Sequence, residues 1–332
     1  MKGNFSIGQI VAASGEKKSG WIPVGDRPSS AGYSVPLTII NGVKEGPVVA
    51  ITAGQNGTEY VGIAAALEIT KRVKPSELSG AILVVPVVNV LGFEQRERYT
   101  FPLDDDFNGK QNMWSLWPGR SDGSLLHKNM RAVFDQVVRR GQYYLDMHGG
   151  DIHEYLIPCT MITLVGDPKV DSESRNLARA VGYEYLIEAP TADSDRGTTK
   201  TEASLSGIPS VVVETGDQGV LRQDLVEKAV SGIMNVMKLL NMVEGPPSSV
   251  KSGVKEIYKM IPVRAEIGGL FVQRIPAGAM VKKGDKIGEV ISIDGNKTQE
   301  VIASETGLII ESFCNPAVYS GDALCEIALL KP

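Results

Sequence analysis

Three short motifs, far apart in the sequence, carry side chains that could bind a metal ion or move a proton. Glu59 ends the segment GQNGTE, His148 lies within LDMHGGD, and Glu214 lies within GIPSVVVETG. Imidazole and carboxylate groups are the usual zinc ligands besides thiolates, and a carboxylate beside a metal can take a proton from bound water. These residue types therefore favour metal-assisted hydrolysis.

Each of the three residues also has a purely structural interpretation. Glu59 could complement the dipole of a helix that begins there. His148 is one of only three histidines in the chain and could be structural, while Glu214 could be a hydrogen-bonded strand end. What favours a site is that all three motifs follow apolar runs, because the ends of strands in α/β proteins open into the crevice where ligands bind.

The apolar runs predict strands that are buried on both faces, as in a parallel or mixed sheet covered by helices. We expect strands at 47–53, 81–88, 143–147, 161–165 and 210–214, and helices at 59–73, 125–139 and 225–242. This alternation of apolar β-type runs and helical periodicity predicts an α/β fold.

The pattern changes after a Gly/Pro/Ser-rich passage at 244–253, which is typical of a linker. Beyond it, short β-type runs alternate with glycine-containing turns, which predicts a small β-barrel or sandwich. We therefore predict a catalytic domain at 1–246 and a small all-β domain at 254–332. This second domain also resembles biotinyl and lipoyl carriers, but the sequence around Lys282 and Lys283 lacks their flanking pattern, so we expect a structural or assembly role.

The composition excludes several classes of partner. The chain has 332 residues, 42% hydrophobic and 22% charged, with a formal net charge of −5 and a pI near 5.4. An acidic protein of this kind is not expected to bind nucleic acid, which requires clustered Lys and Arg. No apolar stretch approaches the roughly 18 residues of a membrane helix, and the first residues contain no secretory core, so we expect a cytoplasmic protein. The three cysteines are expected to be reduced.

The order of the motifs resembles the succinylglutamate desuccinylase/aspartoacylase family, which is related to the zinc carboxypeptidases. That family shows G-x-H-G-x-E, then D-L-H-x-G, then a glutamate that ends a strand before glycine, and the resemblance runs from about Leu37 to the end. It implies a zinc-carboxypeptidase-like mixed sheet flanked by helices and a Zn²⁺ ion that serves amide hydrolysis of N-acyl amino acids. By this resemblance Glu59 and His148 are metal ligands, Glu214 is the catalytic base, and Arg98 polarises the scissile carbonyl.

The chain departs from the family at a metal position, where Asn56 replaces the first histidine. An amide oxygen is a poor zinc donor, and three interpretations stay open. The site could bind metal weakly, bind a harder ion or bind none; Asp151 or His153 could supply a replacement ligand; or the histidine was changed to asparagine by engineering.

A second departure precedes Pro118. Where the family has N-L-N-R-x-F-P-G, this chain reads NMWSLWPG, so the arginine that grips a substrate carboxylate is replaced by Ser115. Trp114 and Trp117 could line an apolar pocket or fill the core. We predict that Trp114, Asn112 and Asp151 contact the substrate.

Two hypotheses follow for the function. The first is a zinc-dependent deacylase that removes an acyl group from a small N-acyl amino acid or amine. The second is a catalytically impaired or metal-free binding protein that retains the family pocket, because both a metal position and a substrate position have changed. Formation of a homo-oligomer is left open.

Overall fold

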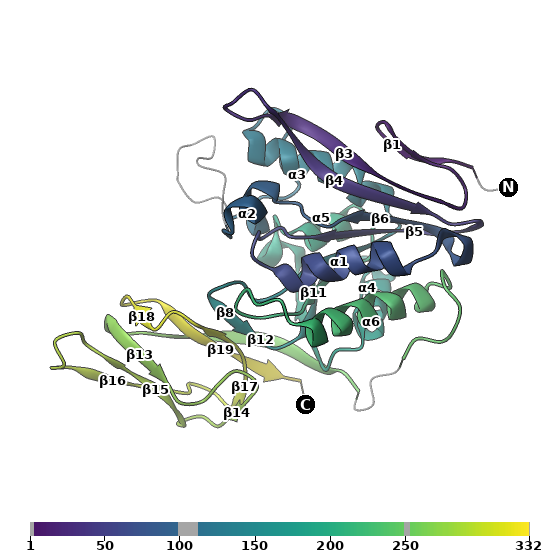
Figure 1. Cartoon of the computed structure of the whole chain (residues 1–332). Helices are drawn as coiled ribbons and strands as arrows, with labels where there is room; N and C mark the ends of the chain where they lie inside the picture. The colour runs from purple at the N-terminus through teal and green to yellow at the C-terminus, as the bar shows by residue number, and fades with distance from the viewer. Residues whose placement is uncertain (1–2, 99–111, 249–252, 332) are drawn as a thin grey trace.

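The computed structural model describes residues 3–98, 112–248 and 253–331. Figure 1 shows an α/β part, formed by most of the chain, beside a β-rich part formed by the C-terminal residues. None of the described helices is long and apolar enough to cross a membrane.

The α/β part is built on a mixed sheet whose central strands follow the order β12-β10-β9-β11-β7-β5-β6-β4-β3. Strands β11, β7, β5 and β6 are parallel, and β9 runs antiparallel to β11. The strands are β3 (Glu16–Asp26), β4 (Gly32–Asn41), β5 (Lys44–Ala53), β6 (Ser79–Val85), β7 (Tyr143–His148), β9 (Cys159–Thr163), β10 (Tyr185–Ala189), β11 (Ser210–Glu214) and β12 (Lys255–Arg264). The predicted mixed sheet is confirmed.

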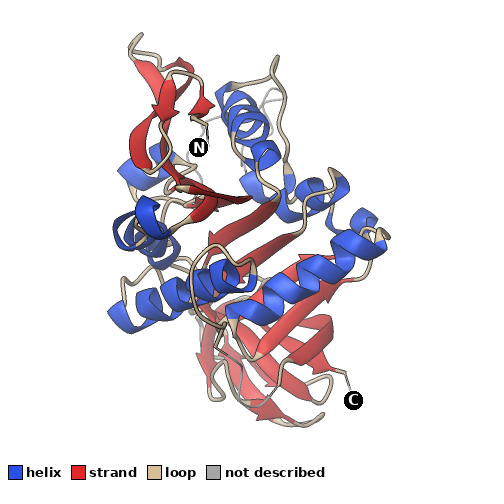
Figure 2. Cartoon of the chain, turned by 90° about the vertical axis from the view of Figure 1, so that its right-hand side faces the viewer, coloured by secondary structure: helices blue, strands red, loops and turns tan. Residues whose placement is uncertain are grey.

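Helices cover both faces of this sheet, as Figure 2 shows. One face packs against α1 (Tyr60–Arg72), α4 (Pro168–Val181) and α6 (Gln223–Leu239), and the other packs against α3 (Leu125–Gln136) and α5 (Thr199–Leu205). The short helix α2 (Val90–Gln95) follows β6, and the two-stranded ribbon of β1 (Phe5–Ile7) and β2 (Ile10–Ala12) joins the second core. Short 3₁₀ turns occupy Pro75–Glu77, Met113–Ser115, Val138–Arg140 and Ala192–Asp195.

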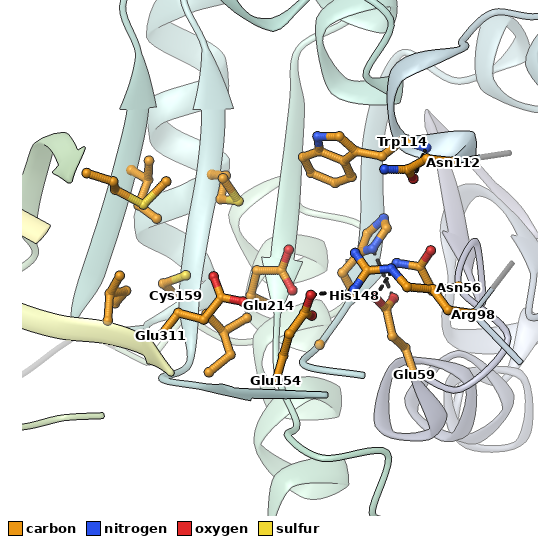
Figure 3. A pocket seen from close by; sticks show the side chains of 16 residues that line it. Asn56, Glu59, Arg98, Asn112, Trp114, His148, Glu154, Cys159, Glu214 and Glu311 are labelled. Atoms are coloured by element: carbon orange, nitrogen blue, oxygen red, sulfur yellow. Dashed lines mark hydrogen bonds and ion pairs between the residues drawn. The ribbon is translucent and has the colours of Figure 1, made fainter. Parts of the chain in front are cut away.

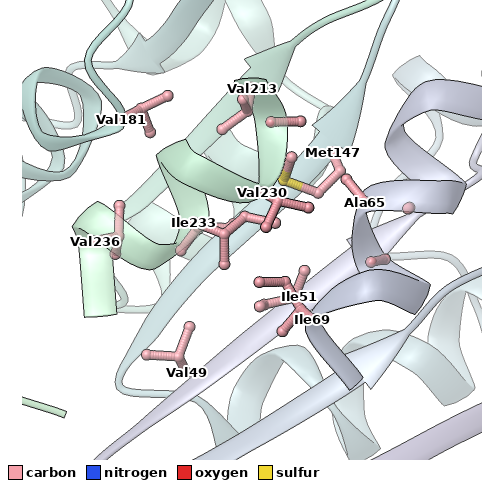
Figure 4. Close-up of a cluster of buried hydrophobic side chains, with 14 of the residues drawn as sticks. Val49, Ile51, Ala65, Ile69, Met147, Val181, Val213, Val230, Ile233 and Val236 are labelled. Atoms are coloured by element: carbon pink, nitrogen blue, oxygen red, sulfur yellow. The ribbon is translucent and has the colours of Figure 1, made fainter. Parts of the chain in front are cut away.

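The strands alternate their side chains between these two cores. In β5, Val49 and Ile51 face α1 and α6, whereas Ala50 faces the opposite layer. Figure 4 shows Ile51 beside Ile69 of α1, with Ile233 of α6 close by. Burial on both faces explains why these strands appear in the sequence as continuous apolar runs.

Among the described C-terminal residues the regular elements are all strands, as predicted. They comprise β13 (Gly269–Gln273), β14 (Met280–Val281), β15 (Lys286–Ile291), β16 (Thr298–Ile302), β17 (Gly307–Phe313), β18 (Ala317–Val318) and β19 (Ala323–Leu330). Strands β16, β15, β13 and β18 form a separate sheet, whereas β17 and β19 continue the large sheet through β12. Strand β8 (Glu154–Leu156) of the α/β part pairs with β17. The two parts are therefore joined by backbone pairing.

Candidate active site

The three motif residues lie together at the ends of neighbouring strands. His148 ends β7, Glu214 ends β11, and Glu59 is the N-cap of α1, shortly after β5. Strand β7 lies between β5 and β11, and Glu214 pairs in register with His148. Figure 3 shows the side chains of Glu59, His148 and Glu214 around one pocket. Parallel strand order thus gathers residues that are more than 60 positions apart.

Two glycines allow the backbone to pass close to its neighbours at this site. A Cβ atom at Gly149 would lie 2.2 Å from the carbonyl oxygen of Thr215, and one at Gly57 would lie 2.2 Å from the carbonyl carbon of Gly92. These separations are far below van der Waals contact, so only glycine fits at either position. The tight turn after β7 keeps His148 against the end of β11.

His148 lies between two carboxylates. Its Nδ1 is 3.0 Å from Glu59 Oε2, and its Nε2 is 3.2 Å from Asp146 Oδ2. Thr52 Oγ1 donates a hydrogen bond of 2.6 Å to Asp146, which orients that carboxylate. Burial alone would lower the pKa of His148, but the charges of Glu59 and Asp146 hold it well above its ordinary value.

Asn56 is buried, and its Nδ2 donates a hydrogen bond of 2.6 Å to Glu59 Oε1. Glu59 Oε2 faces His148 and makes no regular hydrogen bond. This buried oxygen and the imidazole, which Asp146 orients from behind, have the chemistry that holds a divalent metal, and a bound metal would replace the imidazole proton. At the third expected ligand position, Asn56 offers only an amide. No group of three His, Cys, Asp or Glu side chains placed to hold a metal occurs among the described residues.

The two residues considered as replacement ligands are engaged elsewhere. Asp151 accepts a hydrogen bond of 2.5 Å from Arg98 Nη1 and one of 2.8 Å from the backbone N–H of His153. The His153 ring lies 3.0 Å from Asn315 Oδ1, in the C-terminal β part. Asp151, which we predicted to contact substrate, is completely buried and does not line the cavity. Its position is explained by its ion pair with Arg98.

Arg98 lines the cavity, as expected for a residue that contacts substrate. Its guanidinium forms ion pairs with Asp151 and with Glu154 of β8. These carboxylates fix one edge of the guanidinium plane. The carbonyl-polarising role of Arg98 remains a prediction.

Glu214 has no hydrogen bond or ion pair within the described part of the chain, although its side chain is buried and only 8% of the residue is exposed. Burial raises its pKa to about 8, against the opposing charge of His148, and the nearby charges of Glu59 and Glu154 raise it further. A carboxylate with a pKa near neutrality is suited to exchange protons with water or a leaving amine.

The cavity beside these residues measures about 180 Å³, and Trp114 and Asn112 form part of its wall. The Trp114 ring meets His148 edge-on, with 5.3 Å between ring centroids, and the ammonium of the buried Lys200 lies 4.9 Å from the centroid of the indole. Trp117, in contrast, is a core residue whose Nε1 donates to Gln55 Oε1 at 2.7 Å. Trp114 therefore lines the pocket, whereas Trp117 belongs to the core.

Two further carboxylates at the cavity were missed in the sequence. Glu154 binds Arg98, and Glu311 enters from β17 in the C-terminal part. The available signal for Glu311 was its position in GLIIESF, because a carboxylate inside an apolar strand needs a special environment. No pattern in the surrounding sequence predicts that this strand lies beside the motif residues.

Comparisons with known proteins identify the family of the chain. Residues 45–240 match the family described as succinylglutamate desuccinylase/aspartoacylase catalytic domain. The chain belongs to this family. It is 25% identical over 315 residues to an N-alpha-acetyl-L-2,4-diaminobutyric acid deacetylase of Halomonas elongata, covering 92% of this chain and 89% of the relative.

Solved structures share the fold over nearly the whole chain. A succinylglutamate desuccinylase from Silicibacter sp. TM1040 superposes with a TM-score of 0.85 at 21% identity, covering 95% of each chain. The product-bound ectoine utilization protein EutE from Ruegeria pomeroyi gives 0.84 at 23% identity, covering 94% of each chain. The fold shared with these structures therefore includes the C-terminal β part.

Proposed function

We propose that this protein hydrolyses the amide bond of a small N-acylated amine or amino acid. Family membership supports this class of reaction, as does the deacetylase from Halomonas elongata. The observation that carries the proposal is the buried carboxyl group of Glu214, which lines the cavity beside His148 and has no partner among the described residues. Such a group is costly to keep unless it does chemistry.

In the proposed reaction Glu214 takes a proton from the attacking water and later delivers it to the leaving amine. Arg98, fixed by Asp151 and Glu154, donates hydrogen bonds to the carbonyl oxygen as negative charge develops there. The Trp114 ring walls the cavity above His148 and limits the access of bulk water. Each role uses a group that lines the same cavity.

We propose that a divalent metal, expected to be zinc, is held by Glu59 and His148 with Asn56 beside them. When bound, it would supply Lewis-acid activation of the carbonyl and of water. The two ligands and the supporting Asp146 suit such an ion, whereas an amide oxygen is a weaker zinc donor than imidazole. We therefore expect zinc affinity below that of a two-histidine site.

The substrate's carboxylate, if it has one, must be bound without the usual arginine, because Ser115 occupies that position. Lys200 forms an ion pair with Asp195 and does not line the cavity, so it does not replace the missing clamp. A substrate whose recognition does not depend on an α-carboxylate clamp suits this pocket best.

The test is the release of free amine from a panel of N-acetyl and N-succinyl amines and amino acids, measured with an amine-reactive fluorophore. Reactions contain the purified protein alone or with zinc, manganese or cobalt. We expect release from at least one substrate, stimulated by metal and abolished by Glu214→Gln. Absence of release with every metal, together with absence of bound metal, would refute the proposal.

The second candidate function is binding without hydrolysis. The hydrogen bond from Asn56 to Glu59 favours it, because this bond occupies an oxygen that a metal would otherwise use. The substitution Asn56→His separates the two candidates. If zinc binding and amine release appear only in the variant, the chain is a binding protein; if the unaltered chain already releases amine, it is an enzyme.

A further inference from the structure

The cavity extends beyond Glu214, away from His148, into an arm whose floor is apolar. Cys159 of β9 pairs in register with Glu214, and Met161 of β9 pairs with Ile187 of β10. All of these side chains line the cavity, as does Met260 of β12. The arm therefore crosses the sheet from β11 towards β12, along a surface that suits a hydrocarbon chain.

The far end of the arm carries a carboxylate from the C-terminal part. Figure 3 shows Glu311 on the opposite side of Glu214 from His148, with its carboxylate directed towards Glu214. Strand β17 is held there by pairing with β8, where Glu311 faces Leu156. The register of β17 with β19 shifts between Ile309 and Glu311.

This register shift changes which side chains reach the cavity. Successive residues of a regular strand point to opposite faces, yet Ile310 and Glu311 both line the cavity. A β-bulge inserts one extra residue and redirects the side chains beside it. The bulge in β17 thus allows both an apolar side chain and a carboxylate to face the arm.

Among the described residues, the cationic side chains that line the cavity already have anionic partners. Arg98 is paired with Asp151 and Glu154, and His148 lies between Glu59 and Asp146. Glu311, like Glu214, has no hydrogen bond or ion pair within the described ranges 3–98, 112–248 and 253–331. Two carboxyl groups that find no partner among the described residues, one of them nine-tenths buried, therefore face an apolar arm. A cationic ligand is the chemistry that would satisfy them.

We propose that the arm binds a primary ammonium group at the end of a short alkyl chain, with Glu311 as the residue that selects it and Glu214 nearby. The preferred ligand is then an N-acylated diamine or diamino acid, with its amide near His148 and its free ammonium beside Glu311. This inference rests on the proposed function for the acyl-amide part of the ligand. The ammonium preference rests on the arm alone.

The test compares three probes of similar length by isothermal titration calorimetry at pH 7.5. N-acetyl-1,4-diaminobutane carries an ammonium, N-butylacetamide is neutral, and 4-acetamidobutanoate carries a carboxylate. A charge-assisted hydrogen bond in a desolvated pocket changes affinity by about tenfold or more. We expect the ammonium probe to bind at least about tenfold more tightly than the other two.

The substitution Glu311→Gln keeps the shape of the side chain and removes the acidic group that can give up its proton and pair with a bound ammonium, so we expect the preference to fall to within about twofold. The matched control is Glu326→Gln. Glu326 of β19 pairs with Glu311 of β17 but does not line the cavity, so this variant should retain the preference. Full preference in Glu311→Gln, or a neutral probe that binds the unaltered protein as tightly as the ammonium probe, overturns the inference. So does absence of measurable binding of the ammonium probe.

Release of acetate from the same probes separates this inference from the proposed function. Selective binding of the ammonium probe without any acetate release supports the arm and contradicts hydrolysis of that probe. Acetate release at equal rates from all three probes, with equal affinities, supports hydrolysis and refutes the arm.

Discussion

Replacing Glu311 with glutamine should stabilise the protein without ligand, and the gain should depend on pH. Burial raises the pKa of Glu311 to about 9, and the negative charges of Glu154, Glu326 and Glu214 raise it further against the opposing charge of Arg98. The native state therefore keeps a proton that the unfolded chain has already lost, between pH 4.5 and about 9. Stability falls as the pH rises through this window.

The size of the effect follows from the difference between the pKa of Glu311 in the native state and its pKa in the unfolded chain. Each pH unit above 4.5 lowers the free energy of unfolding by about 1.4 kcal/mol. At pH 7 the loss caused by Glu311 therefore reaches about 3 kcal/mol. The glutamine variant has no such proton to hold. Because the side chain also meets water in the cavity, we expect a gain of about 1–3 kcal/mol at pH 7, which is roughly 2–6 °C in Tm, and almost none at pH 4.5.

Thermal unfolding of the unaltered protein and of Glu311→Gln at pH 5, 7 and 8.5 measures this directly. Glu300→Gln is the control, because Glu300 is an exposed partner of Lys286 in the same β part and a surface ion pair contributes little. A gain that is the same at pH 5 and 8.5, or a loss of stability at every pH, would contradict the placement of Glu311 in a desolvated acidic arm.

Three other substitutions test the site. Asn56→His should bind zinc at least tenfold more tightly than the unaltered chain, measured by metal analysis after dialysis against a weak chelator; equal retention would contradict the assignment of this position. Glu214→Gln should lower kcat by about 10²–10⁴-fold while the substrate still binds, and unchanged turnover would exclude it as the base. Gly149→Ala should destabilise the protein by at least about 2 kcal/mol, because the new methyl group would collide with Thr215, whereas Gly32→Ala has open space around it and serves as the control.

Much of the α/β core could be predicted because its signal is local. The expected strand at 210–214 coincides with β11, and the expected helix at 59–73 differs from α1 by one residue at each end. The helix expected at 125–139 ends earlier, at Gln136, and continues as a 3₁₀ turn. Helix α4 was not predicted, because it has only a narrow apolar stripe on a polar helix.

The site was predicted in part. Glu59, His148, Glu214, Arg98, Trp114, Asn112 and Asn56 all line one cavity, whereas Asp151 does not. Motifs at strand ends are visible in sequence because apolar runs stop where the polar residues begin. The partners of those residues are not visible in this way, since Asp146 and Thr52 meet only when β5 and β7 lie side by side.

The sequence by itself determined the alternation of strands and helices, the change to an all-β texture after the linker, and the residue types at the strand ends. Those features depend on periodicity and turn chemistry within a few residues. The tertiary structure decided that Asn56 bonds Glu59, that Trp114 faces the cavity while Trp117 is buried, and that Glu311 reaches the arm from a strand almost 100 residues beyond Glu214. The physical reason is that strand order, register and a single bulge set which side chains meet, and local periodicity does not specify any of these.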